Sequence, residues 1–194
     1  YDEMKGDPDV YDRLKGHTIR LVRSVKRNTA VFFPSYSLMD RFIADGVPEA
    51  LDREVFYEVR GMSQPDLMET VSGFRSSKGS VLFCVTGGRI SEGLDFPDKD
   101  LEMAIIIGIP YPKPTAKQEA LRRYCEYRFG NGWEHAVKTP ARRKMRQAIG
   151  RLIRSETDRG IAVILDRRAA VFEGIGATPS KDPCAEVAKF FAGH

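Results

Sequence analysis

The sequence is poor in cysteine, contains one tryptophan and has no long apolar run. Cys84, Cys125 and Cys184 form neither a CxxC pair nor the even set of a disulfide framework, so we expect three reduced thiols of an intracellular protein. The longest apolar run, MAIIIGI (103–109), is too short to cross a bilayer. These absences argue against a disulfide-rich secreted domain and against a membrane protein.

The beginning of the sequence lacks the pattern of a secretion signal. Residues 1–12, YDEMKGDPDVYD, are polar and acidic, whereas a leader has a basic residue followed by an apolar stretch. The first residue is Tyr1 rather than Met, so we expect the chain to be a part cut from a longer protein.

Two motifs of nucleotide-binding enzymes are also missing. The sequence contains no GxxxxGK[ST] loop, which cradles nucleotide phosphates, and no DExH-like acidic run, which holds magnesium. A nucleotide bound to this chain would therefore need a second domain to supply its phosphate loop.

Five short apolar runs, rich in β-branched residues and nearly unbroken, are present instead. This pattern is typical of strands that are covered on both faces of a parallel sheet. The runs are TAVFFPS (29–35), EVFYEV (54–59), SVLFCVT (80–86), EMAIIIGIP (102–110) and GIAVILD (160–166).

Helical patterns alternate with these runs, at 10–25, 37–46, 63–77, 115–130 and 140–155, and a short closing helix is expected after Thr178. The alternation predicts an α/β fold in which a parallel sheet is sandwiched by helices and joined by right-handed crossovers.

The fourth and fifth runs are about fifty residues apart, too far for one crossover, so we interpret residues 112–146 as a helical insertion. Ten Lys or Arg and three Glu lie between Lys113 and Arg146, a net charge of +7 in a chain whose net charge is +4. This clustering favours a polyanionic partner. Aromatic residues among the cations suit stacking on bases of a single strand, and Tyr127 and Trp133 are the candidates. Packing is the alternative for both, and we expect Tyr124 to pack.

Residues 147–160, QAIGRLIRSETDRG, place Gln147, Arg151 and Arg154 on one stripe if a helix continues through them. Met145, Ala148, Ile149, Leu152 and Ile153 would then form the opposite, buried side. An ordinary solvated face is one interpretation. Because the helical stripe itself holds no acidic residue to pair the arginines, and Glu156 and Asp158 come only after the helix, a phosphate ligand is the other. Gly150, beside the stripe, suggests a close approach to the backbone.

A glycine-rich turn follows the third run, where a ligand of a parallel sheet is expected. Thr86, Gly87 and Gly88 end the strand, and their backbone amides could hold phosphate. Ser91, Glu92, Gly93 and Asp95 follow in what we predict to be a loop. A plain turn with helix caps is the alternative.

Three stretches together resemble a known family. GGRISEGLDF resembles motif V, and QAIGRLIRSETDRG motif VI, of the XPD-type superfamily-two DNA helicases, while AVFFPSYSLMDRF stands where motif IV stands. The resemblance covers nearly the whole chain. It implies that residues 1–194 are a single RecA-like domain, the C-terminal motor domain of such a helicase, and the compact ending suggests an archaeal one.

The resemblance also implies residue roles. Arg151 and Arg154 match the arginine fingers of motif VI, and Gln147 matches its glutamine, which touches the γ-phosphate or the attacking water. Glu92, Gly93 and Asp95 match the nucleotide-side residues of motif V. The residues matching DNA-backbone contacts are Ser35, Thr86, Gly87, Gly88 and Arg89.

The resemblance also implies ligands and partners. Members of the family bind ATP with magnesium between two motor domains, and they move on single-stranded DNA in the five-prime to three-prime direction. The missing first motor domain would carry the phosphate loop, the magnesium box and an iron–sulfur cluster, so no metal site and no ATP hydrolysis are expected of this chain alone. Repair or transcription proteins are further expected partners, and DNA repair, including nucleotide excision repair, is the expected process. The expected location is the cytoplasmic nucleoid in an archaeon or the nucleus in a eukaryote. The alternative is a non-catalytic nucleic-acid or partner-binding module derived from a motor domain.

Overall fold

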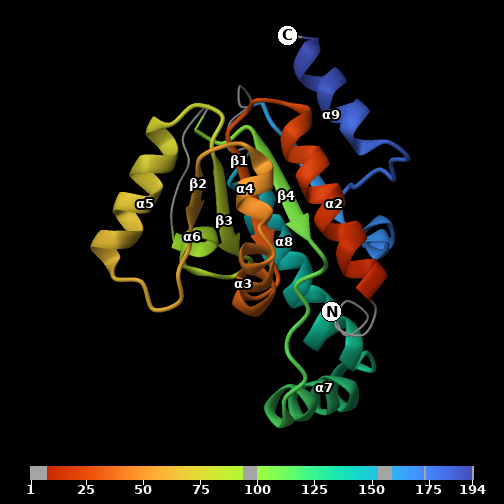
Figure 1. Ribbon diagram of the computed structural model, residues 1–194. Coiled ribbons are helices and arrows are strands. Elements are labelled where there is room, and N and C mark those ends of the chain that lie inside the picture. The colour runs from red at the N-terminus through yellow and green to blue at the C-terminus, as the bar shows by residue number, and fades with distance from the viewer. Residues whose placement is uncertain (1–7, 94–99, 153–158, 173, 194) are drawn as a thin grey trace.

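The computed structural model describes residues 8–93, 100–152, 159–172 and 174–193, and its centre is a sheet of five parallel strands (Figure 1). The spatial order is β2-β3-β1-β4-β5, with four parallel pairings. The strands are β1 (Thr29–Phe33), β2 (Val55–Tyr57), β3 (Val81–Val85), β4 (Met103–Ile107) and β5 (Ile161–Leu165). Each lies inside one of the five apolar runs, so the predicted parallel sheet is confirmed.

Burial explains why these runs are so continuously apolar. Every residue of β1, β3 and β4 is buried, whereas the edge strands β2 and β5 are half-buried. Thr29 of β1 pairs with Val81 on one side and Met103 on the other, which places the most apolar strands in the centre. A strand covered on both faces has no polar side to alternate with.

Helices cover both faces of the sheet. One face packs against α2 (Pro8–Ser24), α3 (Tyr36–Ala44), α4 (Val47–Leu51) and α9 (Pro183–Ala192). The other packs against α5 (Gln64–Ser76), α6 (Arg89–Gly93) and α8 (Thr139–Gly150). Ser63 caps α5 by accepting the Asp66 amide at 3.3 Å, and Pro65 lies in its first turn, as expected. The sandwich is confirmed, and α4 and α6 are additions to it.

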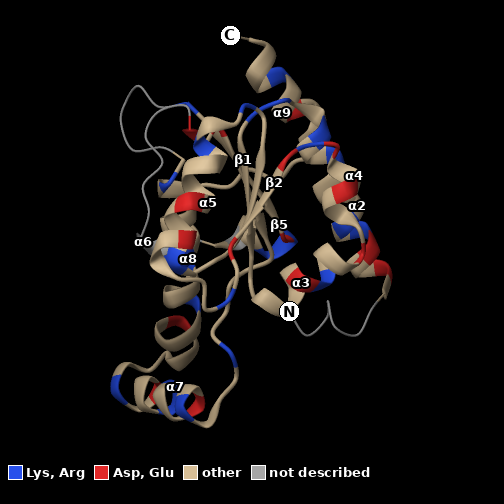
Figure 2. Cartoon of the chain, turned by 60° about the vertical axis from the view of Figure 1, so that its left-hand side comes forward, with Lys and Arg blue, Asp and Glu red and all other residues tan. Residues whose placement is uncertain are grey.

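The segment between β4 and β5 is helical, as predicted, and contains α7 (Ala116–Phe129), the π-helix η2 (Glu134–Lys138) and α8. A 3₁₀-helix, η3 (Arg167–Val171), follows β5. Figures 1 and 2 show α7 projecting beyond the end of the sheet, with Lys, Arg and Glu side by side along it. Several charges of the whole segment are paired: Glu119 with Arg122 and Arg123 within α7, and Glu134 of η2 with Lys138 and with Arg142 of α8. The net positive charge of the segment is therefore only partly available to a partner.

The helix predicted over 140–155 ends earlier than expected, which leaves Gln147 inside it and Arg151 at its end. α8 stops at Gly150, and Arg151 is its C-cap, whose amide donates to the Ala148 carbonyl at 3.3 Å. Such a tightened last turn ends the α-helical path, and glycine favours an end here because it costs helix stability. Arg154 and Ile153 lie outside the described residues.

The two sides of α8 are otherwise as expected. Met145, Ala148 and Leu152 are buried and Gln147 is exposed. The close neighbour expected at Gly150 is not found among the described residues, since nothing lies within 4 Å of a Cβ built there. In the part of the chain that the structure describes, no helix has both the length and the apolarity that a bilayer span requires.

Candidate nucleotide and nucleic-acid interface

The residues that follow β1, β2 and β3 gather at one edge of the sheet, because parallel strands end at the same edge. Ser35 follows β1, Glu58 follows β2 and Thr86 follows β3. Ser35 is 8% exposed and caps α3, its hydroxyl accepting the Leu38 amide at 3.3 Å. The hydroxyl of Ser35 is therefore committed to its helix in this structure.

The turn after β3 needs both of its glycines. Gly87 has φ +78°, a conformation that strains any residue with a Cβ, and it lies under Lys144 of α8: a Cβ built there would be 3.3 Å from Lys144 Nζ. A Cβ at Gly88 would lie 2.4 Å from a carboxylate oxygen of Glu58. The sequence suggested the turn, but neither Lys144 nor Glu58 as its neighbours.

The amides of this turn are already engaged, which limits how it can hold an anion. Each amide of residues 86–89 donates to an acceptor within the chain. The acceptors, in order, are the Phe33 oxygen (2.8 Å), Ser91 Oγ (2.7 Å), the Val85 oxygen (2.8 Å) and Glu58 Oε1 (2.9 Å). The prediction that these backbone amides bind phosphate is therefore wrong for this conformation, and an anion here must be held by side chains.

The side-chain hydroxyl of Thr86, unlike the amides of the turn, has no hydrogen-bond partner among the described residues. Thr86 is 4% exposed, so this hydroxyl is buried. Unsatisfied buried hydroxyls are uncommon in folded proteins, so Thr86 Oγ1 is a polar group that a ligand at this edge could engage.

Glu58 is the central acceptor of the edge, and sequence analysis missed it. It is 1% exposed, and its carboxylate accepts from Tyr36 Oη (2.8 Å), the Val85 amide (3.0 Å) and the Arg89 amide (2.9 Å). Burial, followed by the hydrogen bond to Glu58, raises the pKa of Tyr36 to about 12. The only signal in the sequence is a glutamate at the end of an apolar run.

The segment after the turn is a helix and not the loop that was predicted. Residues 89–93 form α6, which contains Ser91, Glu92 and Gly93, and Asp95 lies outside the described residues. The exposed guanidinium of Arg89 donates to the Met62 oxygen and to Gln64 Oε1. Arg89 is thus anchored beside the start of α5.

The structure brings Arg151 to the segment that follows β3. Arg151 Nε donates to the main-chain oxygen of Ser91 at 3.0 Å, and the side chain is half-buried. Ser91 in turn accepts the Gly87 amide and donates to the Gly88 oxygen at 3.0 Å. Arg151 and the glycine turn are therefore joined through a single residue.

The aromatic candidates belong to the segment that projects beyond the sheet: Tyr127 lies in α7 and Trp133 is the N-cap of η2, and α7 is seen at the end of the molecule in Figures 1 and 2. Tyr127 is 90% exposed and Trp133 is 52% exposed, with the Trp133 ring 6.0 Å from that of Tyr111. Tyr124 is 58% exposed, so the expectation that it packs is wrong. Only Cys125 of α7 is buried, because the helix contacts little beyond η2.

Among the described residues no group of His, Cys, Asp or Glu has the arrangement of a metal site. Cys84 and Cys125 are buried free thiols, and burial raises the pKa of Cys84 well above its usual value.

Comparison with known proteins gives the family. The model of the helicase C-terminal domain matches residues 18–174. The chain is 32% identical over 181 residues to the regulator of telomere elongation helicase 1 homolog of Drosophila ananassae, covering 84% of this chain and 18% of that protein. It is 32% identical over 158 residues to the ATP-dependent DNA helicase CHL1 of Candida glabrata, covering 72% and 19%. It thus spans less than a fifth of these relatives.

A solved XPD helicase structure superposes with a TM-score of 0.65 at 27% identity, covering 82% of this chain and 28% of that one. Both curated relatives come from eukaryotes and give no support to the expected archaeal origin. The chain belongs to the helicase C-terminal domain family, as a C-terminal helicase domain of the XPD type.

Proposed function

We propose that this chain is the second motor domain of an ATP-dependent DNA helicase and supplies Arg151 to a nucleotide held mainly by a first motor domain. The observation that carries the proposal is the hydrogen bond of Arg151 to Ser91. It ties a guanidinium suited to phosphate to the turn after β3, where a ligand of a parallel sheet is expected.

On the nucleotide side, Arg151 acts with Arg154 and Gln147 on the γ-phosphate, and Glu92, Gly93 and Asp95 act as the motif V residues. ATP and magnesium are shared with the first motor domain, which also carries the iron–sulfur cluster of the family. Arginine fingers in other NTPases raise the rate by roughly 10³–10⁵ because they stabilise charge in the transition state. The chain alone is therefore expected to be inactive.

On the DNA side, the backbone of a single strand passes over the exposed face of the turn at Gly87 and Gly88. Lys144 lies beside Gly87, and the Thr86 hydroxyl lacks a partner among the described residues, so both can serve a phosphate after a small shift. Ser35 and Arg89 extend this contact. Residues 112–146 act as an insertion whose exposed Tyr127 and Trp133 stack on bases.

Hydrolysis would then be coupled to movement. ATP draws the two motor domains together through the arginines, and hydrolysis releases them, so a strand lying across both domains advances at each cycle. DNA repair, five-prime to three-prime movement, and action in a nucleus or nucleoid belong to the same proposal, as do further repair or transcription proteins as partners.

The test is reconstitution. The 194-residue chain and the first motor domain of the same protein are mixed, and ATP hydrolysis is measured with and without single-stranded DNA. We expect hydrolysis only in the mixture, stimulated by DNA and lost with the Arg151→Ala variant. Hydrolysis that needs no second domain, or a mixture that stays inactive although the two parts bind each other, would contradict the proposal and favour a non-catalytic binding module.

A further inference from the structure

Three elements of the sheet edge meet at the carboxylate of Glu58. Tyr36 comes from the start of α3, Val85 from the end of β3 and Arg89 from the start of α6, and each donates one hydrogen bond at 2.8–3.0 Å. The three donors are a hydroxyl and two amides, all neutral. A carboxylate that is 1% exposed has lost its water, so these three donors take the place of that water.

The same carboxylate fixes the glycine turn sterically. A Cβ at Gly88 would lie 2.4 Å from one Glu58 oxygen and 2.8 Å from the other, so the turn and the carboxylate are in close contact. Glu58 therefore holds the turn from two sides: it binds the amides before and after Gly87 and Gly88, and it packs under Gly88 itself.

Hydrogen bonds also connect the turn to Arg151 through Ser91. The Gly87 amide donates to Ser91 Oγ at 2.7 Å, and the Ser91 oxygen accepts Arg151 Nε at 3.0 Å. A shift of the turn would move Ser91 and with it the acceptor that places Arg151. Buried groups in contact respond together because packed interiors have few intermediate arrangements.

We propose that Glu58 is a positioning residue that holds the 86–89 turn in its DNA-contacting arrangement. It touches neither the strand nor the nucleotide; it acts through the two amides and through Gly88. This inference rests on the proposed function, because the effect of the turn on DNA requires that the turn contact DNA.

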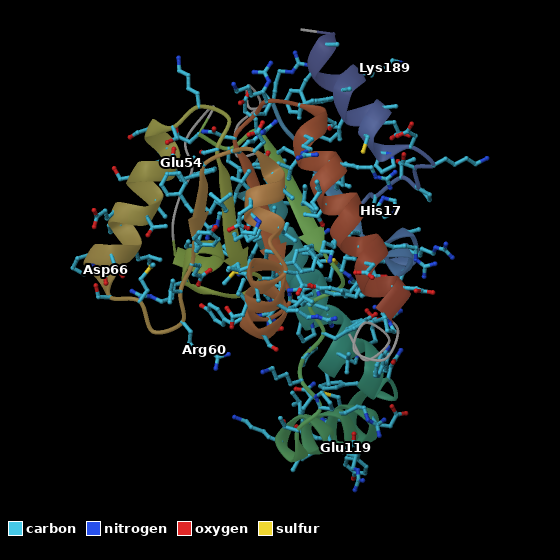
Figure 3. All side chains as sticks on the ribbon, viewed as in Figure 1. His17, Glu54, Arg60, Asp66, Glu119 and Lys189 are labelled. Atoms are coloured by element: carbon cyan, nitrogen blue, oxygen red, sulfur yellow. The ribbon has the colours of Figure 1, made fainter. Side chains whose placement is uncertain are left out.

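The informative variant is Glu58→Gln, which keeps the size of the side chain. An amide has one acceptor oxygen, so its NH₂ group must face either the Val85 amide or the Arg89 amide, and one donor is left unsatisfied. The control is Glu54→Gln. Glu54 lies toward the opposite end of β2 from Arg60 (Figure 3), where its carboxylate accepts from Ser77 Oγ at 2.6 Å on the surface. Both variants change the net charge equally, so a general electrostatic effect on DNA is matched.

Two measurements on the 194-residue chain test whether Glu58 holds the turn and whether this affects DNA binding. Binding of a fluorescent oligothymidylate by anisotropy should be about tenfold weaker in Glu58→Gln and within about twofold of the original in Glu54→Gln. Amide exchange followed by NMR should show faster exchange at Val85 or Arg89 in Glu58→Gln only.

The outcomes are distinguishable. Equal DNA affinity in the two variants, with the original chain binding DNA, would overturn the role of Glu58 and leave the proposed function standing. No binding by the original chain would overturn both, while the exchange data would still report whether Glu58 holds the turn.

A second variant guards against misfolding of Glu58→Gln. Gly88→Ala forces the turn away from the carboxylate without changing Glu58, and it should weaken DNA binding by a similar factor. Because both changes act on the same contact, the double variant should lose less affinity than the product of the two single losses. A fully multiplicative loss would show that Glu58 and the turn act independently.

Discussion

Arg151 Nε donates to the Ser91 carbonyl oxygen at 3.0 Å, joining two segments that are sixty residues apart in the sequence. Ser91 belongs to α6 and Arg151 caps α8, and both helices pack on the same face of the sheet. Because this bond uses Nε, it orients the plane of the guanidinium relative to α6. The bond thus accounts for the placement of Arg151 beside the segment that follows β3.

Replacement of Arg151 by alanine is expected to abolish DNA-stimulated ATP hydrolysis in the reconstituted motor, by about 10³-fold or more, because the developing negative charge on the γ-phosphate loses its cation. Binding of single-stranded DNA by the 194-residue chain should change little. Arg151→Lys is the matched control: it keeps the charge but cannot reproduce the planar fork, so hydrolysis should stay low. Hydrolysis at the original rate in the alanine variant would remove Arg151 from the nucleotide.

The strands could be predicted from sequence because burial leaves a direct trace in residue type. An unbroken apolar run such as residues 81–85 is stable in an α/β protein only as a strand buried between two layers of helices. The family could be predicted for a different reason: motif V and motif VI are specific in both residues and spacing.

The details of the site were harder to predict from the sequence. α8 ends at Gly150, a residue of low helix propensity in an otherwise helical pattern, and Leu152 just beyond it packs into the core. Glu58 could not be found because its donors come from three separate segments. Lys144 meets Gly87 only through the packing of a helix fifty-odd residues further along the chain.

Lys144 offers a test of the DNA path that avoids the paired charges of the segment. Lys144→Ala should weaken binding of single-stranded DNA a few-fold and reduce the slope of log affinity against log salt by about one, as expected for the loss of one phosphate contact. Arg123→Ala serves as the comparison, because Arg123 is paired with Glu119 at 2.9 Å and lies on projecting α7. If the Lys144 variant keeps the original salt slope, the strand does not pass over Gly87.

Tyr127 is the most exposed large apolar side chain of the described residues, with 90% of its surface free. If it stacks on a base, Tyr127→Ala should cost about 1–3 kcal/mol of binding free energy toward single-stranded DNA. The free energy of unfolding should be almost unchanged, since so little of the ring is packed. Titration of the chain with oligothymidylate, alongside Tyr127→Phe as the conservative variant, measures this cost. Equal affinity of the alanine and phenylalanine variants would exclude stacking.

Asp166 gives a prediction on stability that is independent of function. Its side chain is 8% exposed, and its carboxylate accepts from the Ile109 amide at 3.2 Å and from the amide and guanidinium of Arg168. Burial alone raises the pKa of Asp166, but the hydrogen bonds and charge of Arg168 outweigh burial and the pKa is lowered from 3.8.

Because the folded-state pKa of Asp166 lies below its unfolded value, the ionised carboxylate stabilises the fold at every pH above about 4, and this stabilisation is lost as the pH falls through the folded-state pKa. Asp166→Asn should lower the free energy of unfolding by about 1–3 kcal/mol at pH 7, because the buried donors lose a charged acceptor. Urea denaturation at pH 7 and at pH 3 measures both effects, and the difference between the original chain and the variant should shrink at the lower pH. A difference that stays constant over this range would show that the loss comes from packing rather than from the charge of Asp166.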